Sequence, residues 1–381
     1  MSAVPGAAAA PMAAQSRQRR APWQAAAWAA LAALAIAAAL AVNGYYVYVL
    51  ANVALLAIVG IGLNVLLGLT GQVSFGHVGF YAIGAYTVAV LTTKAGWPFW
   101  PAWLAGAVFA TAMGAALALP ALRVKGPYLA MITIAFGFIV EHSAVELGEL
   151  TGGQNGIMGI TPPALPLIAA GERTIAVLAV IVAAFALAAF AKLSRGTWGA
   201  AMRAVRDSET AAESVGLNPL VLKTVAFAIS ACVAGVAGGL FAPLSGMVTP
   251  GSFGFLQSIL FVLVVMIGGA GTVAGPLIGA VIVGLLPEAL SALEEYRLLF
   301  FGALLLIVLW VAPQGVAGLV HVVAARAVRK SAQHSAQSGA AARAAAPTLS
   351  RRVGAARHAR GLTLIFVGGR AVHRLDLDAP P

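Results

Sequence analysis

The chain of 381 residues is 61% hydrophobic and only 9% charged, with a mean hydropathy of +0.94, which lies outside the range of soluble globular domains. Its formal net charge is +11, but the basic residues gather in the N-terminal arm, in short loops and in the C-terminal region, where the positive-inside rule of membrane proteins expects them. The charge therefore does not indicate a nucleic-acid-binding protein, and we predict an integral membrane protein.

The N-terminus, residues 1–24, is predicted to be a basic cytoplasmic arm. Its cluster of Arg17, Arg19 and Arg20 precedes a long apolar stretch without a convincing signal-peptidase site. The first apolar segment is therefore interpreted as a retained helix.

Long apolar segments follow one another from residue 25 to residue 312. Between Ala21 and Leu122 the only charged residue is Lys94, and a helix needs about 20 apolar residues to cross a bilayer. The segments predict an all-α polytopic fold with about ten transmembrane helices. The segments at 255–268 and 274–287 are short, as re-entrant or broken helices are. The predicted spans are 25–42, 46–69, 72–93, 99–119, 126–143, 174–191, 221–244, 255–268, 274–287 and 298–312.

The charges predict the orientation. If the N-terminus is cytoplasmic, so are the loop holding Arg123 and Lys125, the segment 192–220 and the tail from Arg326, which are the basic connections. We expect both termini on the cytoplasmic side of a bacterial inner membrane. The opposite side then receives Glu146, Glu149, Glu172, Glu288, Glu294 and Glu295.

The stretch 62–86, GLNVLLGLTGQVSFGHVGFYAIGAY, combines polar side chains with closely spaced glycines. Polar groups inside a span are costly unless they are partnered or face a cavity, and the glycines predict a helix broken near the cytoplasmic face. Two interpretations stay open: these side chains contact the substrate, or they satisfy freed backbone groups. His77 alone is no metal site, because nothing near it supplies further ligands. The pathway candidates are Asn64, Gln72, Ser74 and His77.

The sequence offers little support for other kinds of functional site. Glu141 and His142, near the outer end of a span, are interpreted either as an outer gate or as solvated end residues. Paired carboxylates deep in a span, an Arg-rich helix and an HExxH motif are all lacking from the sequence, which counts against secondary transport, voltage sensing and intramembrane hydrolysis. Cys232 is the only cysteine, so it forms no disulfide within the chain, and we interpret it as a small core residue.

The segment 203–219, RAVRDSETAAESVGLNP, is charged in an otherwise apolar chain. Its spacing predicts one amphipathic cytoplasmic helix, or a pair, with one apolar stripe facing the bundle. Asp207 or Ser208 is a suitable N-cap, Gly216 a suitable stop, and Asn218-Pro219 a new start. The apolar stripe comprises Trp198, Met202, Val205, Ala212 and Val215.

Several stretches resemble the branched-chain amino acid ABC transporter permeases of the LivM-like type, in the order in which that family has them. Besides residues 62–86 they are GPYLAMITIAFGFIV (126–140), LTGGQNGI (150–157), RGTWGAAMRAVRDSETAAESVGLNPLVLKTVAFAISACVAGVAGGLFAP (195–243) and GGAGTVAGPLIGAVIVGLLPE (268–288).

The resemblance implies a membrane subunit that pairs with a second, similar permease, receives amino acid from a periplasmic binding protein and is driven by ABC ATPase subunits. It implies that the charged segment is the ATPase-coupling loop, whose family pattern places Glu-Ala-Ala three residues before a Gly. Here Thr210 stands where that pattern has Glu, and Glu209 lies one position earlier. The coupling candidates are Arg203, Arg206, Asp207, Glu209, Ala212 and Gly216.

The C-terminal region changes character after Pro313. Residues 313–358 are rich in Ala, Ser, Gln, His and Arg and are predicted to be a flexible basic linker. Residues 359–381 alternate apolar and polar side chains around a Gly-Gly pair, which predicts two strands, and they resemble the first hairpin of the branched-chain amino acid ABC ATPases. We expect either a fusion cut short before its Walker A motif or a disordered tail with chance similarity. The chain contains no Gly-Lys dipeptide and hence no phosphate loop.

The sequence thus predicts a permease domain over residues 25–312 that is not an enzyme. It would import branched-chain or related amino acids, bind no cofactor or metal itself, and depend on ATP hydrolysis by partner subunits. A urea or short-amide permease and a stand-alone secondary transporter are the alternatives.

Overall fold

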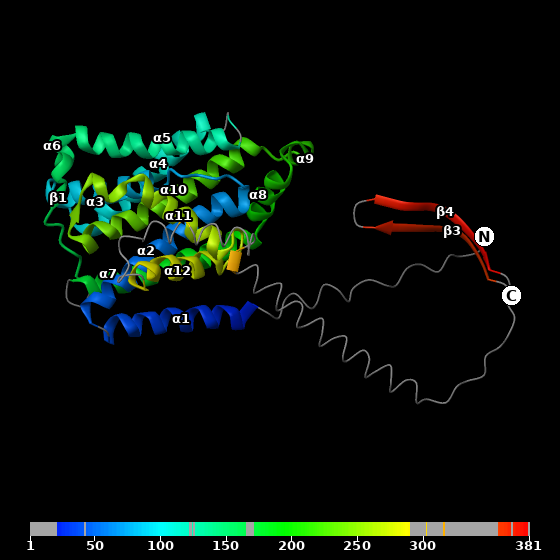
Figure 1. Ribbon diagram of the computed structural model, residues 1–381, viewed down its shortest axis with the longest axis horizontal. Helices are drawn as coiled ribbons and strands as arrows, with labels where there is room; N and C mark the ends of the chain where they lie inside the picture. Colours follow the sequence, from blue (N-terminus) through cyan, green and yellow to red (C-terminus); the bar gives the residue numbers. More distant parts are fainter. Residues whose placement is uncertain are drawn as a thin grey trace. The chain divides into compact units, whose positions relative to one another are not determined.

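The computed structural model describes residues 21–41, 43–121, 124, 126–164, 171–289, 302, 315–316, 357–366 and 369–379. Contacts divide the chain into two units, Met1–Val322 and Val323–Pro381. The described part of the first unit is a helical bundle, and that of the second is a β-hairpin (Figure 1).

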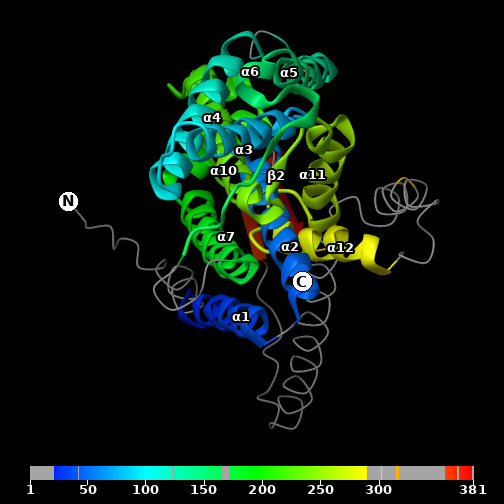
Figure 2. The same cartoon turned by 90° about the vertical axis from the view of Figure 1, so that its left-hand side faces the viewer.

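The bundle consists of long helices whose axes run mostly along one direction (Figure 1), so that several are seen end-on in Figure 2. Short helices and strands connect them. The long elements are α1 (Ala21–Ala41), α2 (Gly44–Asn64) with a π-helix (Val65–Leu69), α3 (His77–Thr93), α4 (Phe99–Ala121), α5 (Pro127–Glu146), α7 (Glu172–Arg195), α10 (Pro219–Ser245), α11 (Phe255–Gly268) and α12 (Gly275–Ala289). The short elements are α6 (Gly148–Thr151), a 3-10 turn (Gly153–Asn155), β1 (Ile157–Met158), α8 (Thr197–Asp207), α9 (Glu209–Ser214), β2 (Met247–Val248) and a second 3-10 turn (Pro250–Phe253).

Every predicted span coincides with one of these helices except 298–312, of which the structure describes only Gly302. Six segments of the described chain are long and apolar enough to cross a membrane, and three shorter apolar helices accompany them. The all-α, polytopic class is therefore confirmed, while a total of about ten spans stays a prediction. The predicted span at 72–93 begins later than expected, at His77, because residues 70–76 leave the helix.

Helix α10 is the central helix, and it packs most extensively against α4, α3 and α2 (Figure 2). Small residues make this packing possible: a Cβ on Gly84 of α3 would lie 2.1 Å from the carbonyl oxygen of Gly235 on α10. A Cβ on Gly238 would lie 1.9 Å from the Tyr81 carbonyl oxygen. Within lipid, such close backbone approach supplies the dispersion contacts that hold helices together.

The bundle has two distinct ends. The β1–β2 end carries the strand pair Ile157↔Val248 and Met158↔Met247, the start of α2 and the end of α12, where the Tyr45 hydroxyl bonds to Glu288. The α8–α9 end carries α8, α9 and the end of the π-helix. The two short helices α11 and α12 pack together and are joined by residues 269–274.

The second unit contains the predicted strand pair. Strand β3 (Arg357–Phe366) pairs antiparallel with β4 (Gly369–Ala379), with Phe366 opposite Gly369. The two-strand prediction is confirmed, although the first strand begins slightly earlier than residue 359. The domain boundaries of the sequence and the likeness of this hairpin to an ATPase stay predictions.

Candidate functional site

The break predicted after α2 is present and has a defined geometry. The helix widens into the π-helix Val65–Leu69 and then leaves helical structure at Gly71, whose φ is +72°. A wider turn leaves backbone carbonyls without their usual partners, and π-helical turns are rare. The carbonyl oxygen of Gly68 accepts a hydrogen bond from Arg206 of α8 at 2.8 Å, so this freed backbone group is satisfied by a side chain distant in sequence.

Asn64 holds the start of the π-helix to the loop between α11 and α12. Its Nδ2 donates to the Thr272 carbonyl oxygen at 2.9 Å, and its Oδ1 accepts from the Gly271 amide at 2.7 Å. A Cβ on Gly68 would lie 2.4 Å from both the Asn64 Oδ1 and the Gly271 nitrogen. Only glycine therefore fits where these two segments meet.

Ser74, His77 and Ser230 form a buried hydrogen-bond chain that ends on α2. The Ser230 hydroxyl donates to the Gly62 carbonyl oxygen at 2.6 Å. The Ser230 Oγ must therefore accept from the N–H group at His77 Nε2, with 2.6 Å between Nε2 and Oγ. His77 Nδ1 then accepts from the Ser74 hydroxyl at 3.2 Å. The partners thus fix one neutral tautomer of His77.

Gln72 lies in the same broken segment and is 7% exposed. The Thr70 hydroxyl donates to the Leu66 carbonyl oxygen at 2.6 Å, and the Gln72 Oε1 lies 3.3 Å from the same hydroxyl. Asn64, Gln72, Ser74 and His77 are therefore all buried and all lie within hydrogen-bond distance of neighbouring groups in the chain. In this conformation they satisfy freed backbone and side-chain groups.

A cavity of about 130 Å³ lies elsewhere in the bundle, between α2, α3, α10 and the start of α11. Its wall combines aliphatic and aromatic side chains with neutral polar ones, and the Tyr81 ring packs against Phe241 and Phe261 at centroid distances of 5.5 and 5.4 Å. Sequence reasoning missed these residues, because single polar groups spread over four helices leave no local motif. The lining residues are Asn52, Leu55, Leu56, Tyr81, Phe241, Ser252, Gln257 and Phe261.

Glu141 and His142 lie in the last turns of α5, at the end of the span where the sequence places them. His142 is exposed and its Nδ1 lies 2.9 Å from the Phe138 carbonyl oxygen. Glu141 borders a small hollow beside Phe75 and Phe138. The described ranges contain no cluster of three or more His, Cys, Asp or Glu that could hold a metal ion.

The charged segment folds as the predicted pair of helices, α8 and α9. Ser208 separates them as the N-cap of α9, accepting from the Ala211 amide at 3.3 Å. Gly216 follows α9 with a φ of +84°, a left-handed conformation that favours glycine. Asn218 caps α10 by accepting from the Leu220 and Val221 amides at 3.0 and 3.3 Å. The predicted caps and stop are confirmed.

The predicted apolar stripe is only partly correct. Met202, Val205 and Ala212 are buried at 0%, 2% and 2% exposure, whereas Trp198 and Val215 are 50% and 74% exposed. Trp198 lies in the first turn of α8 and Val215 beyond the last turn of α9. Only the middle of the helix pair therefore packs against the bundle, and its two ends project into the surroundings.

Both arginines of α8 are bonded within the chain. The Arg203 Nη1 donates to the Ser194 carbonyl oxygen at 2.7 Å, at the end of the neighbouring helix α7. The Arg206 guanidinium contacts the Asp207 carboxylate through Nε and Nη2, both at 3.1 Å, while its Nη1 reaches Gly68. Arg203 is half-buried, whereas the Arg206 side chain is 38% exposed and reaches the bundle through Nη1. The other exposed residues of the segment include Asp207, Thr210, Glu213 and Gly216.

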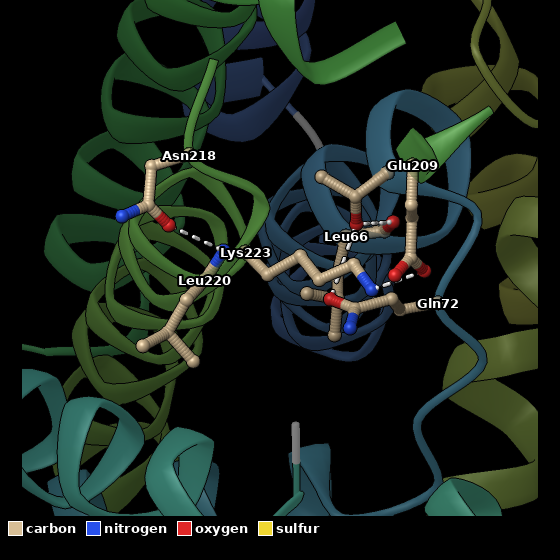
Figure 3. A network of polar contacts seen from close by, with 7 residues as sticks. Leu66, Gln72, Glu209, Asn218, Leu220 and Lys223 are labelled. Carbon is tan, nitrogen blue, oxygen red and sulfur yellow. Dashed lines mark hydrogen bonds and ion pairs between the residues drawn. The ribbon is translucent and has the colours of Figure 1, made fainter. Parts of the chain in front are cut away.

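Glu209 forms an ion pair with Lys223 of α10, with 2.6 Å between Oε1 and Nζ (Figure 3). The two side chains are only 32% and 11% exposed, so water screens the pair less than a surface pair. Sequence reasoning singled out Glu209 but missed Lys223, for which the only signal is a lysine in the first turns of an apolar helix. The pair joins α9 to a long helix of the bundle.

Comparison with known protein families matches residues 45–309 to the model described as "Branched-chain amino acid transport system / permease component". The chain is similar to the high-affinity branched-chain amino acid transport system permease protein LivM of Escherichia coli K12, at 36% identity over 68% of this chain, and to LivM of Salmonella typhimurium, at 35% over the same share. It also resembles LivH of Escherichia coli K12, at 28% identity over 69% of this chain and 91% of LivH.

The matched stretch covers 66% of the length of each of these two LivM proteins. No solved structure gives a significant match to the chain.

Proposed function

Because this chain belongs to the family of branched-chain amino acid transport permease components, we propose that it is the membrane subunit of an ABC importer for Leu, Ile and Val or related amino acids. Its multiple apolar helices make it a multi-pass membrane protein. The proposal places it in a bacterial inner membrane with both termini in the cytoplasm.

The proposed complex contains three kinds of partner: a second, similar permease, ABC ATPase subunits and a periplasmic binding protein. The similarity to both LivM and LivH supports pairing of two related permeases. This chain would bind no cofactor, and the ATPase subunits would bind and hydrolyse ATP. ATP-driven closure of the ATPases would move α8 and α9. These two helices would then shift, as rigid bodies, the spans to which they are bonded.

The observation that carries the proposal is the α8–α9 helix pair. It is anchored by Met202, Val205 and Ala212, while Asp207, Thr210 and Glu213 stay exposed. A surface held to the bundle that presents these polar groups together with Trp198 and Val215 on its outer side could dock an ATPase subunit and transmit its movement. The proposal assigns the ATPase contact to these exposed residues.

The cavity near the β1–β2 end supports the substrate class. A small aliphatic amino acid needs an apolar wall for its side chain and hydrogen-bonding groups for its polar end. Leu55, Leu56 and Phe261 supply the first, and Asn52, Ser252 and Gln257 supply the second. The proposal assigns this cavity to the substrate pathway.

The test is uptake into liposomes that contain the permease with its proposed partners. Labelled Leu, Ile, Val and urea are compared, with and without ATP and binding protein. We expect uptake of the branched-chain amino acids that needs all components and disappears when the ATPase carries a substituted phosphate-loop lysine. Uptake that persists without ATPase subunits would instead show a stand-alone transporter, and uptake of urea alone would show the amide permease.

A further inference from the structure

Arg206 connects three segments that are far apart in the sequence. It lies in the last turn of α8, and its Nη1 donates to the carbonyl oxygen of Gly68 in the π-helix at 2.8 Å. A Cβ on Gly271, in the loop between α11 and α12, would lie 3.9 Å from the same Nη1 and 3.3 Å from the Gly68 carbonyl oxygen. The guanidinium thus lies at the junction of α8, the end of α2 and the α11–α12 loop.

The junction packs closely against the inner side of this side chain, which stays 38% exposed on its outer side. Gly71 has a φ of +72°, and a Cβ there would lie 2.7 Å from the Arg206 Cγ. Asp207 contacts the Nε and Nη2 edge of the guanidinium at 3.1 Å and so leaves Nη1 directed at Gly68. Arginine suits this arrangement because its donors are fixed in one plane, whereas a lysine offers a single charged nitrogen.

A second pair of hydrogen bonds extends the connection from the π-helix to the next span. Asn64 lies one turn before Gly68, and it binds both Gly271 and Thr272. Thr272 in turn accepts at its hydroxyl from the Gly275 amide, the first residue of α12, at 3.0 Å. An unbroken series of contacts therefore runs from α8 through the π-helix to the start of α12.

The geometry points to Arg206 as the positioning residue that couples the α8–α9 pair to the broken end of α2, with Asn64 passing the movement on to α12. The inference rests on the proposed function, since it assumes that an ATPase moves α8 and α9. A tight junction of this kind transmits displacement, because packed elements shift as units rather than deform continuously. Arg206 would then act through its contacts within the permease rather than by contacting the ATPase.

The test compares Arg206→Met with Lys192→Met in the complete reconstituted complex. Both substitutions replace one cationic side chain at the same end of the bundle, but Lys192 is an exposed residue in the last turn of α7. The measured quantity is amino acid imported per ATP hydrolysed. We expect this ratio to fall at least tenfold for Arg206→Met, with ATP hydrolysis and assembly retained, and to stay within about twofold of wild type for Lys192→Met.

Asn64→Leu provides the second variant, because it breaks the link to Gly271 and leaves the Arg206 contact in place. It should lower the same ratio without changing the substrate concentration that gives half-maximal uptake. A substrate-binding role for Asn64 would instead raise that concentration. An unchanged ratio for Arg206→Met, or an equal loss for Arg206→Met and Lys192→Met, would overturn the inference.

A measurement on the wild-type complex covers the case in which the variants do not assemble. Hydrogen exchange is followed in residues 65–76, 197–214 and 269–274, with and without a non-hydrolysable ATP analogue. The coupling predicts that all three segments change together, and a change confined to 197–214 would contradict it. If the wild-type complex itself imports nothing with ATP, the proposed function fails, which is a different outcome.

Discussion

At the scale of single residues, the four polar groups of the broken segment illustrate what a sequence can and cannot show. Asn64, Gln72, Ser74 and His77 stand out by type in an apolar span. Their partners, among them Ser230 and Thr272, lie more than 150 residues away. The sequence was sufficient to predict that such groups need partners and left open whether the substrate or the chain itself supplies them, but it could not identify the partner residues. The prediction that they line the pathway is still open.

Removal of the Ser230 hydroxyl should destabilise the bundle. Ser230→Ala leaves the His77 Nε2 hydrogen without its buried partner, and an unsatisfied buried donor costs about 1–3 kcal/mol. The Gly62 carbonyl oxygen loses the same hydroxyl but keeps the hydrogen bond from the Val65 amide. The midpoint of thermal unfolding in detergent should therefore fall. Ser143→Ala removes the same group from an exposed site on α5 and should leave the midpoint unchanged; equal midpoints for both variants would contradict the prediction.

Gln257→Leu should weaken uptake without affecting folding. Its amide faces the cavity beside Asn52 and Ser252, and losing one hydrogen bond to substrate of about 1 kcal/mol lowers affinity roughly fivefold. The half-saturating concentration of leucine in the uptake assay measures this effect. Gln154→Leu makes the same change at an exposed position in the 3-10 turn Gly153–Asn155. A similar rise in the half-saturating concentration for both variants would argue against substrate binding in the cavity.

At the scale of elements, helix ends were the most predictable features, because capping depends on neighbours in the sequence. Ser208, Gly216 and Asn218 act at the predicted places. The π-helix was not predicted in that form, since the glycines of residues 62–86 indicate a break but not the geometry that Arg206 and Asn64 stabilise. Tertiary contacts decide such details.

Packing of α3 against α10 should not tolerate a methyl group on Gly84. An added Cβ would lie 2.1 Å from the Gly235 carbonyl oxygen, which is backbone and cannot move aside cheaply. Gly137 on α5 is the control, because its added Cβ would meet Val78 at an ordinary 3.5 Å. We expect Gly84→Ala to lower the unfolding temperature strongly. Gly137→Ala should be neutral or slightly stabilising, as alanine favours the helix by up to about 1 kcal/mol.

The ion pair between α9 and α10 should contribute more than a surface pair. Glu209→Gln leaves the Lys223 ammonium, only 11% exposed, without this carboxylate, which we expect to cost about 1–3 kcal/mol. Limited proteolysis of the α8–α10 connection should then become faster. Glu213→Gln changes an exposed residue of the same helix and should leave the cleavage rate close to that of wild type.

At the scale of the whole molecule, hydrophobicity alone was sufficient to predict a polytopic bundle, since a bilayer leaves few other ways to satisfy the backbone. The pairing of β1 with β2 and the contact of Arg206 with Gly68 join segments distant in the sequence. Such pairings follow from packing and could not be predicted from periodicity. The sequence therefore indicates the elements at each end of the bundle, but not which of these elements contact one another.

The hydrogen-bond chain through His77 has a consequence for energy conversion. A line of hydroxyls and imidazoles can conduct protons only if both of its ends exchange them, and this one ends on the peptide oxygen of Gly62, which cannot pass a proton on. The chain is therefore closed to proton flow in this conformation. Uptake by the reconstituted complex should be unchanged when an ionophore abolishes the pH gradient at constant ATP; a proportional loss would show that protons contribute to the driving force.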